Sequence, residues 1–155
     1  MKGKKKSKRT RLILLSLLAA FVFIQFVPVD KSVPKVEENL DFMAITKPSD
    51  EIKDILVTAC YDCHSYKTEY PWYSSLAPVS FYVQHHIDEG REELNFSEWG
   101  EFSMDKKNHK LHECAEMTED GDMPLTSYTI THGDAKLDKA QKALLAEWFE
   151  SLMEE

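Results

Sequence analysis

Beyond residue 49 the hydrophobic residues of the chain recur with the period of a helix. Ser49 and Asp50 are suited to cap a helix, and apolar residues follow them at spacings of three and four positions. These apolar residues are Ile52, Ile55, Leu56, Ala59 and Cys60. The spacing predicts a helix that begins near residue 50 and runs directly into the segment 60–64.

Two further helical segments are predicted in the middle of the chain. Pro78 suits the first turn of a helix over 79–91, which Gly90 is expected to break. The segment 95–97 indicates a turn into a short helix that carries Trp99, with Ser97 as its N-cap.

The C-terminal part of the chain predicts two more helices. Residues 105–119 form one candidate, which the segment 121–124 ends, with Leu111, Cys114 and Ala115 facing inward. Asp138 and Gln141 stand at the spacing of a capping box before the second. The apolar side of that last helix holds Leu144, Leu145, Trp148, Phe149 and Leu152. Because no convincing strand and no internal repeat is found, the pattern predicts an all-α fold.

The N-terminal segment has a different pattern. Seven Lys and Arg within residues 1–11 precede an apolar run over 12–27, in which only Ser16 and Gln25 are polar. A basic start before an apolar helix is typical of a signal-anchor whose N-terminus stays in the cytoplasm. A cleaved signal peptide is the alternative, but the bulky residues 26–29 contain no convincing small-residue cleavage site. The pattern therefore predicts a transmembrane helix.

Four parts are expected along the chain. They are a basic cytoplasmic region at 1–11, the signal-anchor transmembrane helix at 12–29, a spacer at 30–48 and a helical domain at 49–155. The net charge of −8 combines the basic start with an acidic remainder, in which 12 Lys and Arg face 27 Asp and Glu. Such an acidic domain repels nucleic acid, and a partner steered to it by charge is expected to be basic.

The chemistry of the chain is concentrated in Cys60-x-x-Cys63-His64, the attachment signature of haem c. Two thiols at this spacing can form thioethers with the two vinyl groups of one haem, and the adjacent imidazole of His64 can then ligate the iron. We therefore expect a cytochrome c-like helical domain wrapped around one covalently attached haem c. A disulfide or redox pair is the first alternative. Zinc, with His109 and His112 or Cys114, is the second.

Met123 is the first choice for the second axial iron ligand. It stands beside Pro124 in a non-helical stretch ahead of the last helix, and His/Met ligation raises the reduction potential of a haem. A methionine that simply fills the core is the alternative for this residue. The competing ligands are His85 and His86, then His132, His109 and His112, and an open position on the iron is also considered.

Several other residues have weaker claims to the site. Arg91 is either a partner of a haem propionate or a solvated side chain, and Cys114 is expected to be a buried thiol rather than half of an intermolecular disulfide. The aromatic residues that could contact a porphyrin, or else belong to the core, are Tyr70, Trp72, Tyr73, Trp99 and Tyr128.

Three stretches of the sequence resemble the bacterial haem-binding domain family of small, membrane-anchored c-type cytochromes. They are 60–80, with its Pro-Trp-Tyr segment, 86–99, with Asn-Phe-Ser-x-Trp, and 121–128, with Gly-Asp-Met-Pro. The similarity covers about residues 45–153. It implies covalent haem at Cys60 and Cys63, ligation by His64 and by Met123, and, with the signal-anchor, a single-pass protein of the bacterial inner membrane with its haem domain in the periplasm. Gly133 departs from the proline expected after His132.

The expected activity is one-electron transfer outside the cytoplasm, with a basic redox protein as partner. Iron held by both His64 and Met123 has no position for a substrate, so an electron carrier is favoured over an enzyme. A haem-based redox or gas sensor is the first alternative. A haem enzyme such as a peroxidase, with His85 or His86 as its acid–base residue, is the second.

Overall fold

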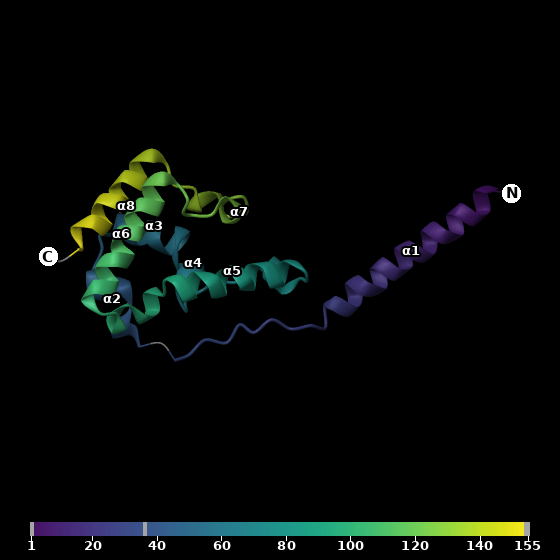
Figure 1. Ribbon diagram of the computed structural model, residues 1–155, viewed down its shortest axis with the longest axis horizontal. Helices are drawn as coiled ribbons and strands as arrows, with labels where there is room; N and C mark the ends of the chain where they lie inside the picture. The colour runs from purple at the N-terminus through teal and green to yellow at the C-terminus, as the bar shows by residue number, and fades with distance from the viewer. Residues whose placement is uncertain (1, 36, 154–155) are drawn as a thin grey trace. The chain divides into compact units, whose positions relative to one another are not determined.

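The computed structural model describes residues 2–35 and 37–153, except for the side chains of 2–7, and every regular element within them is helical (Figure 1). The predicted all-α class is confirmed for these residues. The chain forms two compact units. The smaller contains Met1–Ser32 and Tyr70–His86, and the larger contains Val33–Glu69 and Ile87–Glu155.

The smaller unit begins with the helix α1, Lys2–Ile24, which is followed by a turn at 25–27. Its later helices are η2, Trp72–Ser75, and the first part of α5, Val79–Glu93. The side chain of Gln25 exchanges two hydrogen bonds of 3.0 Å with the backbone of Ala77. This pairing holds the end of α1 against the segment that precedes α5.

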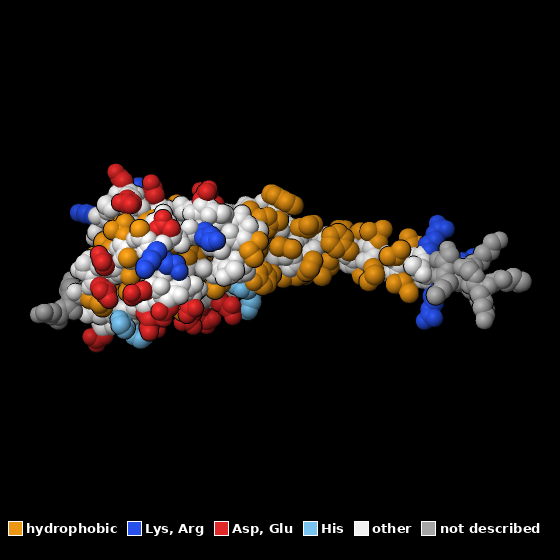
Figure 2. Space-filling model, turned by 90° about the horizontal axis from the view of Figure 1, so that it is seen from above, with side chains coloured by type: hydrophobic (Ala, Val, Ile, Leu, Met, Phe, Trp, Pro, Cys, Tyr) orange, Lys and Arg blue, Asp and Glu red, His pale blue; other side chains and the backbone are white. Residues whose placement is uncertain are grey.

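The predicted transmembrane helix at 12–29 is contradicted by the structure. Because α1 ends at Ile24, its apolar part is 12–24, which contains the polar Ser16 and is about 20 Å long at roughly 1.5 Å per residue, against a hydrocarbon core of about 30 Å. Figure 2 shows the hydrophobic side chains of α1 following its basic residues. In the described part of the chain, no helix has both the length and the apolar character needed to span a membrane. The finding overturns the single-pass anchor and the inner-membrane localisation inferred from it.

The larger unit is built around an aromatic core. The ring of Phe42, whose side chain is fully buried, lies 4.8 Å from Phe96, 4.7 Å from Trp99 and 5.5 Å from Trp148 between centroids. These rings come from α2 (Phe42–Thr46), η3 (Phe96–Glu101) and α8 (Lys139–Ser151). Together with η1 (Glu38–Leu40), α2 therefore occupies part of the segment expected to be a spacer.

The helix predicted to begin near residue 50 is confirmed as α3, Asp50–Ala59, with the Ser49 side chain accepting a hydrogen bond from the Ile52 amide. It ends one residue before Cys60, whose φ of −127° is not helical, and the short helix α4, Tyr61–His64, follows. The two helices are thus separated by Cys60. The expected continuous run into 60–64 is wrong at that residue.

The C-terminal helices follow the predicted pattern closely. Helix α6, Met104–Asp120, ends at Gly121, which takes a φ of +84° that favours glycine. The capping box of Asp138 and Gln141 begins α8, and α6 lies beside α8 (Figure 1). Between them lie α7, Thr126–Thr129, and η4, Gly133–Ala135.

The N-cap of the short helix η3 is not the residue predicted from the sequence. Asn95, rather than Ser97, caps η3, because the Asn95 side chain accepts a hydrogen bond from the Ser97 amide at 3.1 Å. The Ser97 hydroxyl instead accepts a hydrogen bond from the backbone amide of Tyr66 at 3.0 Å. A long-range contact therefore uses the side chain that the local pattern had assigned to capping.

Candidate functional site

The predicted haem-attachment residues lie in a single turn of the larger unit. The amides of Cys63 and His64 both donate to the carbonyl of Cys60, at 3.2 Å and 2.9 Å. This attachment turn, formed by Cys60 and α4, therefore carries both thiols and the imidazole on one short, closed piece of backbone. The structure brings together Cys60, Cys63 and His64 as the spacing predicts.

Helix α5 approaches this turn closely at Gly90. A Cβ atom at position 90 would lie 2.9 Å from the carbonyl oxygen of Cys63 and 3.2 Å from its Cβ, too close for any side chain without a shift of backbone. The expected break at Gly90 is wrong, since α5 continues to Glu93. A glycine inside a helix often marks such a close approach, and this was the signal that could have identified it.

The close approach places the ring of His64 against two carbonyls of α5 and its end. His64 Nδ1 lies 2.8 Å from the Gly90 oxygen and 3.1 Å from the Leu94 oxygen. Because carbonyl oxygens only accept hydrogen bonds, Nδ1 carries the proton and Nε2 keeps its lone pair. Burial lowers the pKa of His64, which favours the neutral imidazole. The residue is thus prepared to ligate a metal through Nε2.

The electrostatics of the two thiols argue against a redox-active pair. Burial, followed by the neighbouring Cys63, raises the pKa of Cys60 to about 12, and burial with nearby Asp62 raises that of Cys63 to about 11. Redox and nucleophilic cysteines have lowered pKa values, because the thiolate is the reactive form. Both cysteines are free in the structure, so the disulfide alternative is not what it shows.

The zinc alternative is also not supported. His109 Nε2 lies 3.2 Å from a carboxylate oxygen of Glu113. Among the residues that the structure describes, no group of three or more His, Cys, Asp or Glu side chains is arranged to hold a metal ion. Cys114 packs against the core, where burial raises its pKa, as expected of a buried thiol.

Arg91 stabilises the chain that leaves the turn. Its Nε donates to the carbonyl of Ser65 and its Nη2 to the hydroxyl of Thr68, both at 2.8 Å. Arg91 is therefore a partly buried side chain bonded to the protein rather than a solvated one, and its pairing with a haem propionate stays a prediction. Arg91 and Gly90 are adjacent, so the same part of α5 contacts the turn and the segment that follows it.

Tyr61 anchors the other side of the turn to the core. Its hydroxyl donates to Asp41 Oδ1 at 3.1 Å and accepts from the Met43 amide at 3.3 Å. Asp41 is almost fully buried, and its Oδ2 makes no hydrogen bond but lies 3.1 Å from Lys67 Nζ. The ion pair with Lys67 compensates the buried charge of Asp41. The hydrogen bond between Tyr61 and Asp41 ties the segment before α3 to the attachment turn.

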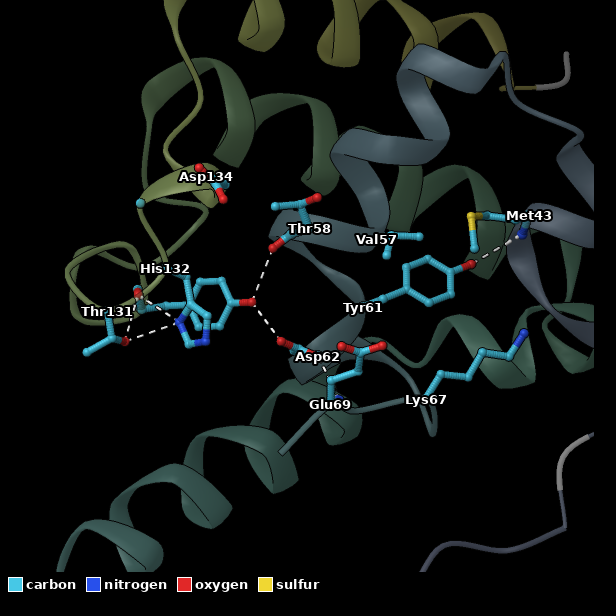
Figure 3. A pocket seen from close by; sticks show the side chains of 12 residues that line it. Met43, Val57, Thr58, Tyr61, Asp62, Lys67, Glu69, Thr131, His132 and Asp134 are labelled. Atoms are coloured by element: carbon cyan, nitrogen blue, oxygen red, sulfur yellow. Dashed lines mark hydrogen bonds between the residues drawn. The ribbon is translucent and has the colours of Figure 1, made fainter. Parts of the chain in front are cut away.

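A cavity of about 520 Å³ borders the turn on the face of Tyr61 and Asp62 (Figure 3). Cys60, Cys63 and His64 are not among its lining residues, so it is distinct from the face that would receive the haem. The phenol of Tyr128 reaches into this region and donates to Asp62 Oδ2 at 2.8 Å, and the Thr58 carbonyl oxygen lies 3.1 Å from the phenol oxygen. The contact of Tyr128 with a porphyrin, one of the two roles considered from the sequence, stays a prediction.

Met123 lies on the loop between α6 and α7, about 60 positions after the attachment turn. Its amide donates to the carbonyl of Met117 at 3.0 Å, and its side chain is partly buried. Among its competitors, His86 Nδ1 lies 3.0 Å from the Tyr82 carbonyl, and His132 stacks on Tyr128. The assignment of Met123 as an iron ligand stays a prediction.

The other aromatic candidates divide between core and surface. Trp99 belongs to the aromatic core and is 3% exposed, which confirms its structural alternative. Trp72 is 82% exposed in the smaller unit. The residue that the sequence analysis missed is Leu94, whose backbone carbonyl carries no signal in the side-chain pattern.

The turn fits a haem: it offers two neutral thiols and an imidazole whose free nitrogen is fixed by backbone acceptors. Neither the curated proteins nor the solved structures gave a match to the chain. A family model described as a haem-binding domain, however, matches residues 19–151, which is most of the chain. On this evidence the chain binds haem and its iron, and it belongs to the haem-binding domain family.

Proposed function

We propose that the chain carries one haem c, bound covalently through Cys60 and Cys63, and that it transfers single electrons. The observation that carries the proposal is the hydrogen bonding of His64, whose Nδ1 faces the carbonyls of Gly90 and Leu94. This arrangement fixes both the tautomer and the ring orientation of an axial ligand, and such backbone acceptors are typical of ligating histidines.

The residues have separate roles in this proposal. The Sγ atoms of Cys60 and Cys63 would each hold the haem by one thioether, formed by addition of S–H across a vinyl group, with the thiol proton passing to the adjacent carbon. His64 Nε2 and the sulfur of Met123 would ligate the iron. When bound, the haem supplies an iron that changes between the ferric and ferrous states. The buried core around Phe96 excludes water from one side of the imidazole.

The expected partner is a redox protein with a basic docking face. The segments that form the larger unit contain 11 Lys and Arg against 26 Asp and Glu, a balance of −15. Figure 2 shows acidic side chains over the visible face of this part of the chain. Electron exchange with a small basic redox protein should therefore slow about tenfold or more when the salt concentration rises from about 10 mM to about 200 mM.

The covalent bond is tested by haem staining after denaturing electrophoresis. The protein is produced together with a haem-maturation system, and the wild type and Cys114→Ala should both stain, whereas Cys63→Ala should lose most of its stain. Cys114→Ala is the matched control, because it removes a thiol outside the turn. Haem that passes entirely into acidified organic solvent from the wild type would contradict covalent attachment.

The second ligand is tested by the absorption spectrum of the oxidised protein. Sulfur ligation gives a far-red charge-transfer band, which Met123→Ala should abolish and the control Met104→Ala should keep. Met104 begins α6 and is 45% exposed, so its side chain can be removed at little cost. A band that survives in Met123→Ala would reject this ligand. A high-spin wild-type spectrum would instead favour a sensor or an enzyme over an electron carrier.

A further inference from the structure

The loop that carries Met123 is held at its beginning by α6. Gly121 ends that helix with a φ of +84°, and the Met123 amide then donates to the Met117 carbonyl at 3.0 Å. The left-handed glycine is a common way to end a helix, and the bond from Met123 returns the chain to the last turn of α6. The backbone just before the sulfur of Met123 is therefore held by contacts with the end of α6.

The same loop is held at its other end by a side chain. Five positions after Met123, the phenol of Tyr128 donates to Asp62 Oδ2 at 2.8 Å, and the Thr58 carbonyl oxygen lies 3.1 Å from the phenol oxygen. Asp62 stands between the two haem-attachment cysteines. The hydroxyl of Tyr128, in the helix α7 that follows the Met123 loop, thus joins this part of the chain to the attachment turn.

Both partners of this contact are themselves held in place. The second oxygen of Asp62 accepts the Glu69 amide at 2.8 Å, which orients the carboxylate toward Tyr128. The ring of Tyr128 stacks on His132 at 4.0 Å and 15°, and the His132 amide donates to the Tyr128 carbonyl at 3.0 Å. Burial raises the pKa of Tyr128, so the phenol keeps the proton that it donates. The contact is preorganised from both sides.

We propose that the hydrogen bond between Tyr128 and Asp62 is a positioning contact that holds the second iron ligand, Met123, in its bound place. The inference rests on the proposed His64/Met123 ligation. Tyr128 touches neither the iron nor the sulfur in this role. It acts by restricting the excursions of the loop, so that its loss favours states in which the sulfur has left the iron.

Tyr128→Phe removes only the hydroxyl and keeps the ring on His132. A hydrogen bond to a charged acceptor contributes enough to change an equilibrium about tenfold or more. We therefore expect imidazole, added as the competing iron ligand, to bind the oxidised haem protein about tenfold more tightly in Tyr128→Phe than in the wild type. The far-red band should weaken on mild warming, and the reduction potential should fall, because sulfur ligation raises it.

Conservative replacements of the acceptor sharpen the test. Asp62→Asn keeps one neutral acceptor oxygen, which cannot serve both the Tyr128 phenol and the Glu69 amide, so imidazole binding should fall between that of the wild type and that of Tyr128→Phe. Asp62→Ala should resemble Tyr128→Phe. The matched control is Tyr66→Phe, which removes a hydroxyl bonded to Glu98 and outside the Met123 loop. It should leave the band, the potential and imidazole binding unchanged.

The outcomes separate this inference from the function on which it rests. A wild type without the far-red band contradicts Met123 ligation itself. A wild type with the band, combined with imidazole binding in both Tyr128→Phe and Asp62→Ala within twofold of the wild type, overturns the positioning role alone. A Tyr128→Phe protein that fails to fold also overturns it, because the hydroxyl would then support the whole unit rather than the loop.

Discussion

The two segments that carry the proposed iron ligands are held by different kinds of contact. The turn of His64 is enclosed by the backbone of α5, with two carbonyls on Nδ1 and a glycine that permits the approach. The loop of Met123 is joined to that turn by one phenol. The contacts at Gly90 and Leu94 involve the backbone of a helix and of its end, whereas the contact of a single hydroxyl can be lost by a small movement. The difference predicts a permanent histidine ligand and a more exchangeable methionine.

The largest effect on the turn of His64 is expected from a substitution at Gly90, where α5 approaches Cys63. Gly90→Val would place side-chain atoms against the carbonyl and Cβ of Cys63, where only backbone could yield. We expect a loss of about 3 kcal/mol in the free energy of unfolding and a reduced yield of haem-stained protein. Urea denaturation of the variant and of the wild type measures the first effect, and the stained gel measures the second.

Gly133 provides the matched control for this substitution. A Cβ atom at position 133 would meet no atom within 4 Å, so Gly133→Val should change the stability by less than about 0.5 kcal/mol. Equal effects of the two substitutions would show that the close approach of α5 to the turn is not what stabilises it.

A smaller loss of stability is expected from Tyr61→Phe, which affects the turn that carries His64 and not the loop that carries Met123. The lost hydroxyl leaves the amide of Met43 and one oxygen of buried Asp41 with one partner fewer. We expect a loss of about 1–2 kcal/mol in the free energy of unfolding, with the far-red band and imidazole binding unchanged. Tyr82→Phe, at a ring that is 52% exposed, serves as the control. A weaker far-red band in Tyr61→Phe would show that the turn of His64 and the loop of Met123 are not independent.

The smallest effect is expected at a surface pair on α6. The hydrogen bond from Lys110 at 2.7 Å is the main cause that lowers the pKa of Glu113 below its ordinary 4.5. A lowered carboxylate pKa stabilises the fold above that ordinary value, and the contribution is lost as the pH falls through the folded pKa. Glu113→Gln should therefore cost about 0.5 kcal/mol at pH 7, because solvent screens the pair, and nothing near pH 2. An effect that persists at acid pH would exclude the ion pair as its source.

The elements predicted correctly from the sequence are those whose signals are local. Ser49 caps α3, and the box of Asp138 and Gln141 begins α8, because capping depends on residues two or three positions apart. The placement of Cys60, Cys63 and His64 in one turn follows in the same way from their spacing. No partner distant in sequence is needed for any of these features.

The errors occurred where a distant residue decided the outcome. Gly90 was expected to end its helix, but the contact with Cys63 uses the missing side chain and the helix continues. Ser97 was expected to cap a helix, but its hydroxyl serves the amide of Tyr66. Phe42 stood in a segment with no clear period, yet it lies at the centre of the aromatic core.

By itself, the sequence determined the helical class, the capped helices and the three chemical groups of the attachment turn. These follow from the local preferences of the backbone and from fixed covalent spacing. Only the tertiary structure decided that Gly90 and Leu94 orient His64, that Tyr128 reaches Asp62, and that α1 ends at Ile24. Such contacts join residues tens of positions apart, and their selection depends on how all the helices pack at once.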